Sequence, residues 1–123
     1  MIAYGTTKKI AIMTNFCKYD VVVVKFPFAS SLKYKARPAV VISSDTYNKN
    51  SRNSVLILAV SSSIDNKLEF EVDICDWQEA GLLKPSIFKS AIATIESASI
   101  ISKLGSLTKN DIDRIAKFID KIC

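Results

Sequence analysis

The residues best suited to binding phosphate lie in one short segment, Lys-Tyr-Lys-Ala-Arg-Pro, which ends at Pro38. Arg37 carries a planar fork of donors that matches two phosphate oxygens, and Pro38 biases it toward extended backbone at the start of a strand. Lys33 and Lys35 add positive charge, and Tyr34 offers a ring for stacking. The segment therefore suits single-stranded nucleic acid. The alternative is a solvated loop whose arginine pairs with a carboxylate.

A second polar cluster consists of three consecutive serines that follow an apolar segment ending at Val60. At the end of a strand, the hydroxyl groups of Ser61 and Ser62 can donate to a phosphate or polarise a ribose hydroxyl. The alternative is an ordinary turn, which serine also favours. No glycine pattern of a nucleophile elbow supports a serine nucleophile.

The remaining acid, base or electrostatic candidates are Asp20, Asp45, Glu96 and Lys89. Their spacing is not diagnostic of paired-carboxylate catalysis. Lys89 is placed to act electrostatically on a phosphate, with simple exposure to solvent as the alternative. These residues leave the identity of a general base open.

The composition excludes several kinds of chemistry, because the 123-residue chain contains no histidine. Histidine is the usual acid or base near neutral pH and the commonest metal ligand. Its absence removes Ser-His-Asp hydrolysis, Cys-His proteolysis and histidine-based zinc sites. The three cysteines are isolated and without metal-ligand spacing, which indicates reduced thiols, and we expect no metal and no cofactor.

The positive charge is concentrated in the first half of the chain. The net charge is +5, and residues 1–52 carry nine basic and two acidic side chains against eight basic and ten acidic side chains in residues 53–123. This asymmetry favours a localised anion-binding face. The alternative is chance combined with a loose basic N-terminus.

Length and patterning predict one compact domain. Residues 1–18 lack clear periodicity and are expected to form a poorly ordered extension, and residues 19–123 are expected to form the domain. The apolar stretch after Lys9 is too short for a signal peptide, and no run reaches the roughly 20 residues of a membrane span. We therefore expect a cytoplasmic protein.

Five segments have the composition of strands, namely residues 21–28, 38–42, 55–60, 67–74 and 87–95. Residues 67–74 alternate strictly between charged and apolar side chains, which predicts a strand with one wet face. Residues 43–54, between two of these strands, are polar and predict a loop. Short strands followed by a helix predict an α+β domain, a small twisted antiparallel sheet or β-barrel closed by a C-terminal helix.

Near the C-terminus the spacing of apolar residues changes from that of strands to that of a helix, which predicts a C-terminal helix. One face carries the apolar residues Ile112, Ile115, Ala116, Ile119 and Ile122. Thr108 is the expected N-cap residue, with Asp111 at the third helical position.

The order of several blocks resembles the MazF/PemK family of toxin endoribonucleases. The matching blocks are YDVVVVKFPF at 19–28, KARPAVVIS at 35–43, LAVSS at 58–62, AGLLKPS at 80–86, ATIE at 93–96 and KLGSL at 103–107. Each block is weak alone, but their order and spacing are fairly specific. The resemblance spans nearly the whole domain.

The resemblance implies a PemK-like small barrel, related in shape to SH3-like folds, that forms a homodimer. It implies the toxin half of a type II toxin–antitoxin pair, cutting single-stranded RNA (mRNA) at short sequences without a metal. The catalytic positions of the family carry over to Arg37 and Ser61. Substrate binding is then expected at Lys33, Tyr34, Lys35, Ser62 and Lys89.

The resemblance also implies partners. A cognate antitoxin is expected to place an acidic, disordered tail in the RNA groove, and operator DNA is expected to be bound only through the antitoxin.

Two departures keep a second hypothesis open. Where many relatives have an acidic residue and an arginine before Thr-Ile, this chain has Ala91 and Ala93. The rival hypothesis is a weak or inactive PemK-like binding module that acts on a protein target or serves only as an antitoxin-bound corepressor.

Overall fold

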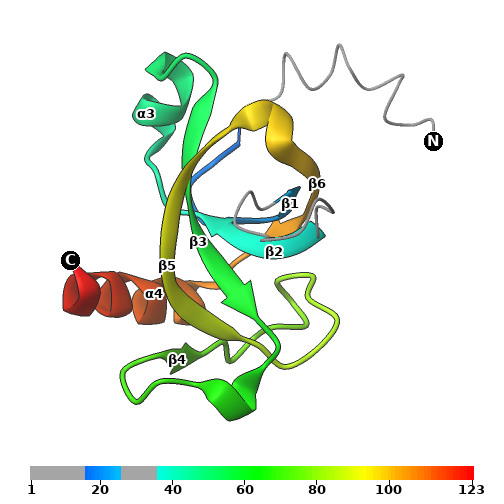
Figure 1. Cartoon of the computed structure of the whole chain (residues 1–123), viewed down its shortest axis with the longest axis vertical. Coiled ribbons are helices and arrows are strands. Elements are labelled where there is room, and N and C mark those ends of the chain that lie inside the picture. The colour runs from blue at the N-terminus through cyan, green and yellow to red at the C-terminus, as the bar shows by residue number, and fades with distance from the viewer. Residues whose placement is uncertain (1–15, 26–35) are drawn as a thin grey trace.

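The structure, a computed structural model, describes residues 16–25 and 36–123 and consists of one curled antiparallel sheet with helices around it (Figure 1). Its strands are β1 (Asp20–Lys25), β2 (Ala36–Val41), β3 (Ser54–Ser61), β4 (Val72–Asp73), β5 (Ile87–Glu96) and β6 (Ile100–Ser106). The α-helices are α3 (Asp45–Asn50) and α4 (Lys109–Ile122), and the short 3₁₀ helices are η1 (Ile64–Asn66) and η2 (Ser97–Ser99). The predicted α+β class is confirmed.

The strands follow the order β4-β5-β3-β2-β1-β6, and all of their pairings are antiparallel. Figure 1 shows β3 and β5 side by side along the long axis, with α3 at one end and β4 at the other. Among the described residues, β4 and β6 remain sheet edges that do not pair with each other. The predicted closed barrel is therefore wrong, because the two-residue β4 offers too short a ladder to join the ends.

Both faces of the central strands are buried, which explains the uninterrupted valines of β1. One face packs Val21, Val40, Leu58 and Phe88 against Ile115 and Phe118 of α4. The other face turns inward on itself and buries Val22, Val24, Ala39, Ile57 and Ile95. A strand with two buried faces needs apolar side chains at every position.

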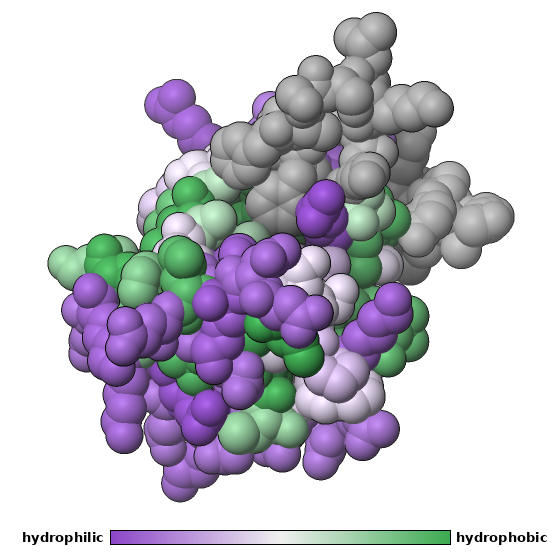
Figure 2. Space-filling view, turned by 60° about the horizontal axis from the view of Figure 1, so that its bottom comes forward, coloured by the Kyte–Doolittle hydropathy of each residue, from purple (hydrophilic) through white to green (hydrophobic). Residues whose placement is uncertain are grey.

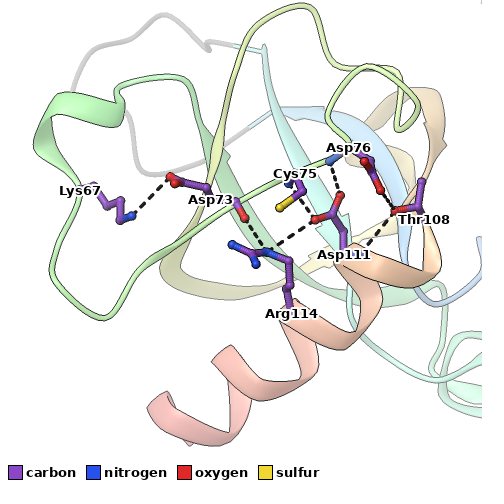
Figure 3. Close-up of polar contacts among 7 residues, drawn as sticks. All are labelled: Lys67, Asp73, Cys75, Asp76, Thr108, Asp111 and Arg114. Atoms are coloured by element: carbon purple, nitrogen blue, oxygen red, sulfur yellow. Dashed lines mark hydrogen bonds and ion pairs between the residues drawn. The ribbon is translucent and has the colours of Figure 1, made fainter.

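The N-terminus of α4 is fixed to residues 73–76 by a polar network that we call the α4 junction (Figure 3). The buried Asp111 carboxylate accepts hydrogen bonds from the backbone N–H groups of Cys75 and Asp76, each at 2.8 Å. Thr108 caps the helix as predicted, and its hydroxyl donates to the Asp76 carboxylate at 2.6 Å. Arg114 donates to the Asp73 carbonyl oxygen at 3.1 Å. These contacts hold α4 and its apolar face on the sheet.

The structure corrects the prediction for residues 67–74. Only Val72 and Asp73 form a strand, whereas Leu68 and Phe70, expected in the core, are 49% and 42% exposed. Glu71, expected on the wet face, is 2% exposed. Figure 2, which brings the lower end of Figure 1 forward, shows apolar side chains in separate small areas between polar ones.

Other predictions differ in detail from the observed elements. The expected loop at residues 43–54 contains α3, whose N-cap Ser44 accepts a hydrogen bond from the Tyr47 N–H. The strand β6 lies outside the five segments that the sequence predicts as strands. On α4, Ala116 is exposed and Phe118 is buried in its place. The strand prediction for residues 26–28 and most of the proposed N-terminal extension lie outside the described residues, so the boundary at residue 18 stays a prediction.

Candidate functional site

Arg37 and Ser61 lie on neighbouring strands and share one pocket. β2 pairs with β3 in an antiparallel register that sets Ala39 opposite Ala59, and Arg37 and Ser61 lie beyond this pair, each two residues from it. An open pocket of about 250 Å³ is lined by Ala36, Arg37, Pro38, Val60 and residues 61–63. Arg37 and the serine cluster, which the sequence singles out separately, therefore line the same pocket.

The Arg37 side chain is available to an external anion. Arg37 is exposed, at the second position of β2, and Pro38 lies opposite Val23 in the β1–β2 ladder. Among residues 16–25 and 36–123, no hydrogen bond or ion pair engages its guanidinium group. The alternative of an arginine that pairs with a carboxylate therefore finds no support in this part of the chain. An unpaired guanidinium keeps its five donors for a ligand.

The Ser61 hydroxyl is oriented by its own turn. Its oxygen accepts a hydrogen bond from the backbone N–H of Ser63 at 3.0 Å. The hydroxyl hydrogen remains for donation, because a serine oxygen can accept and donate at once. Ser62 and Ser63 are exposed at the rim of the pocket. The serine cluster thus makes the predicted turn and also keeps a donor beside Arg37.

The other predicted binding residues are distributed differently. Lys33, Tyr34 and Lys35 lie outside the described residues, which resume at Ala36. Lys89 does not line the pocket, and its ammonium group lies 3.5 Å from the carboxylate of Glu71.

The acidic candidates Asp20, Asp45 and Glu96 do not line the pocket. Asp20 is buried and accepts from the Ser106 hydroxyl at 3.1 Å and from the Cys17 N–H at 2.8 Å, and Lys103 lies 3.4 Å away. Asp45 accepts from the Lys18 N–H at 3.0 Å, and Glu96 is exposed at the far end of β5. Asp20 therefore ties β1 to β6 instead of acting in the pocket.

Glu71 is a buried polar residue that sequence reasoning missed. Burial by itself raises the pKa of its carboxyl group, but the N–H groups of Leu68 and Ser90, the Ser90 hydroxyl and the Lys89 ammonium group outweigh this effect and hold the pKa below its usual range. The signal in the sequence that could have identified it is the Lys89-Ser90 pair on β5, which supplies donors for a buried carboxylate.

The two alanines at the positions where relatives carry polar residues occupy unlike environments. Ala91 is exposed, and Ala93 is half-buried opposite Ile57, packed on the inward-turned cluster. Neither offers a group to the pocket.

Within residues 16–25 and 36–123, no group of three or more histidine, cysteine, aspartate or glutamate side chains is placed to hold a metal ion. In the same part of the chain, every helix is too short or too polar to cross a membrane.

Several solved structures have a similar fold. A mycobacterial endoribonuclease solved in complex with its cognate antitoxin superposes with a TM-score of 0.68 at 15% identity, covering 89% of this chain and 94% of that one. Mycobacterium tuberculosis toxin MazF-mt6 gives a TM-score of 0.66 at 18% identity over 84% and 94% of the two chains. A chain of the MazE–MazF complex from Deinococcus radiodurans gives 0.67 at 19% over 89% and 93%.

Sequence comparison places the chain more directly. No curated protein sequence matches it. The family profile of PemK-like, MazF-like toxins of type II toxin–antitoxin systems, however, matches residues 18–123, which is most of the chain. This protein therefore belongs to the PemK-like, MazF-like toxin family.

Proposed function

We propose that this toxin is a metal-independent endoribonuclease that cuts single-stranded RNA at the pocket of Arg37 and Ser61. The observation that carries the proposal is the juxtaposition, in one open pocket, of an exposed guanidinium group without a partner among the described residues and an oriented hydroxyl. Solved proteins of this fold that are called endoribonucleases support the same activity. The basic residues Lys33 and Lys35 precede the pocket in the sequence.

The chemistry asks little of the protein beyond electrostatics. A ribose 2′-oxygen loses its proton and bonds to the adjacent phosphorus, the bond from phosphorus to the 5′-oxygen breaks, and the 5′-oxygen gains a proton. Negative charge builds on the phosphorane oxygens in between. Arg37 contacts these oxygens and Ser61 donates to a phosphate oxygen or orients the 2′-hydroxyl. Arg37 stays protonated, so it stabilises charge and does not accept the proton.

A cleavage assay tests this assignment. Labelled single-stranded RNA of mixed sequence is incubated with the wild-type protein and the Arg37→Ala variant in the presence of EDTA. Loss of one preorganised donor should lower the cleavage rate about 10²- to 10³-fold, while circular dichroism stays unchanged. Arg52→Asn is the matched control, because it removes an exposed arginine just before the opposite end of β3, and asparagine tolerates its φ of 51°. Equal rates for Arg37→Ala and wild type would overturn the assignment.

A second candidate function is a PemK-like module that binds RNA or a protein without cleavage. The absence of polar side chains at Ala91 and Ala93 favours it. The same assay decides, because wild-type protein that retains RNA in a gel shift and yields no product supports the module instead of the enzyme.

The proposal includes partners. We infer that the toxin works as a cytoplasmic homodimer, that its cognate antitoxin places an acidic tail over the pocket, and that operator DNA is reached through the antitoxin. A complex between a toxin fold and its antitoxin is known for similar structures. Co-expression with the antitoxin should shield labelled RNA from cleavage, and size-exclusion chromatography of the free toxin should give twice the 13.6 kDa chain mass.

A further inference from the structure

Glu71 is a buried carboxylate for which the proposed mechanism has no use. Its side chain is 0% exposed, and four donors surround it. One oxygen accepts from the Leu68 N–H at 2.9 Å and lies 3.5 Å from the Lys89 ammonium nitrogen. The other accepts from the Ser90 N–H at 2.9 Å and the Ser90 hydroxyl at 3.1 Å. Both oxygens of this buried carboxylate therefore have hydrogen-bond partners, which is the condition for burying a charged group in a stable protein.

The donors from Lys89 and Ser90 belong to an irregularity in β5. The ladder pairs Leu58 with Ile92 and Val60 with Phe88, so three residues of β5 face the single residue Ala59 of β3. The extra residues of such a bulge lose their ladder partners. The Glu71 carboxylate supplies the missing acceptor for the Ser90 N–H.

This bulge begins beside the pocket. Ser61 lies opposite Ile87, and Lys89 is two residues farther along β5. Lys89 is the first residue of the bulge and directly follows Phe88, which lies opposite the pocket-lining residue Val60. Its side chain is 30% exposed. An ammonium group has three hydrogens, so contact with Glu71 leaves donors for a phosphate.

We propose that Glu71 is a positioning residue for the RNA-binding face, which holds the β5 bulge so that Lys89 contacts a backbone phosphate next to the one cut between Arg37 and Ser61. The inference rests on the proposed function and extends it by one subsite. It predicts a change in RNA affinity on substitution of Glu71 that is opposite in sign to the change expected from charge alone. Removing an anion should tighten RNA binding if charge alone mattered, whereas loss of the carboxylate is here expected to weaken it.

The test measures binding of mixed-sequence 2′-O-methyl RNA, which cannot be cleaved because its 2′-oxygen is blocked. Fluorescence anisotropy is recorded for wild type, Glu71→Gln, Lys89→Gln and the double variant between about 50 and 200 mM salt. Each single variant should weaken binding about fivefold, the worth of one exposed charge pair. The double variant should be no weaker than either single variant, because both remove the same contact.

The salt dependence separates positioning from a purely structural role. Each phosphate contact on a single strand contributes about −0.7 to the slope of log K against log salt concentration, so the loss of one contact makes the slope shallower by about 0.7. The slope for Glu71→Gln should be shallower than the wild-type slope by this amount, although the substitution removes no cation. Glu69→Gln is the matched control, since it removes an exposed carboxylate two residues away and should leave slope and affinity unchanged or slightly raise the affinity. Ser90→Ala removes one donor to Glu71 and should change the slope and the affinity in the same direction as Glu71→Gln, but by a smaller amount. This variant replaces Glu71→Gln in the test if Glu71→Gln does not fold.

Two outcomes would overturn the inference. Tighter binding by folded Glu71→Gln would show that Glu71 acts only through its charge, and a double variant whose losses add would show that Glu71 and Lys89 act independently. Both results leave cleavage at Arg37 intact. If the wild-type protein neither binds nor cuts RNA, the proposed function fails as well, which is a distinguishable result.

Discussion

The strand-end pocket and the α4 junction are both rich in polar side chains, yet they use them in opposite ways. At the junction, Asp111 is 0% exposed and receives two backbone hydrogen bonds, and the Thr108 hydroxyl is bonded to Asp76. In the pocket, Arg37 is exposed and its guanidinium group has no partner in the described part of the chain. The junction satisfies its hydrogen bonds internally, whereas the pocket keeps donors for a ligand.

This difference separates stability from activity. A buried acceptor that loses its partners, or a buried donor left unpaired, costs folding free energy. An exposed donor is solvated by water in the free protein and contributes only when a ligand replaces that water. Substitutions at the junction should therefore unfold the protein, and substitutions in the pocket should disable it while it stays folded.

The largest stability effect is expected for Asp111→Ala. It leaves the N–H groups of Cys75 and Asp76 unpaired at a partly buried site, and should lower the free energy of unfolding by about 3 kcal/mol. Urea denaturation measures this change, and Asp113→Ala, on the exposed face of α4, is the control. RNA cleavage per folded molecule should stay at the wild-type rate. A rate that falls in parallel with Arg37→Ala would break the comparison.

The next effect is on activity and concerns Ser61→Ala. Loss of one neutral hydrogen-bond donor to the reacting phosphate should slow cleavage about tenfold, close to 1.4 kcal/mol, with little change in the urea midpoint. Ser61→Thr keeps the hydroxyl and should recover most of the rate, as measured in single-turnover reactions. If Ser61→Ala cuts RNA at the wild-type rate, the serines only form a turn, the alternative that the sequence also allows, and take no part in cleavage.

A smaller stability effect is expected for Thr108→Ala. It removes the N-cap acceptor of α4 and the donor to Asp76, and should cost about 1 kcal/mol of unfolding free energy. Thr108→Ser retains both functions and should unfold close to wild type in the same urea series. If alanine and serine behave alike, the cap does not hold the junction, and Asp111 carries it alone.

The sequence predicts the parts of this molecule whose signals are local. The valine run of β1, the isoleucine stripe of α4 and the Thr108 cap each lie within a few neighbouring residues, and all are found, although Ala116 of the predicted stripe is exposed. Arg37 and Ser61 could be named because each stands at a strand end with its own chemistry. Their proximity depends on the β2–β3 register, which a resemblance suggests and periodicity alone does not fix.

What the sequence hides is decided by contacts between distant residues. The alternation of residues 67–74 predicts a wet Glu71, but Ser90, nineteen positions away, draws the carboxylate inward. Only two residues of that stretch remain in the ladder as β4. Gly81 also depends on distant residues, because its φ is 92° and any side chain at this position would collide with the Leu104 carbonyl oxygen of β6. At residues 67–74, tertiary contacts overrode the local period.

The smallest effect is the pH dependence that the buried carboxyl group of Glu71 gives to stability. Its donors hold its pKa below the ordinary value of 4.5, although burial acts in the opposite direction and limits the net shift. A lowered pKa in the folded state contributes stability that is present above 4.5 and is lost as the pH falls through the folded pKa. The difference in unfolding free energy between wild type and Glu71→Gln should therefore narrow as urea denaturation is repeated from neutral pH into the acid range. A difference that stays constant with pH would mean that the hydrogen-bond geometry, and not the charge, of Glu71 holds the bulge.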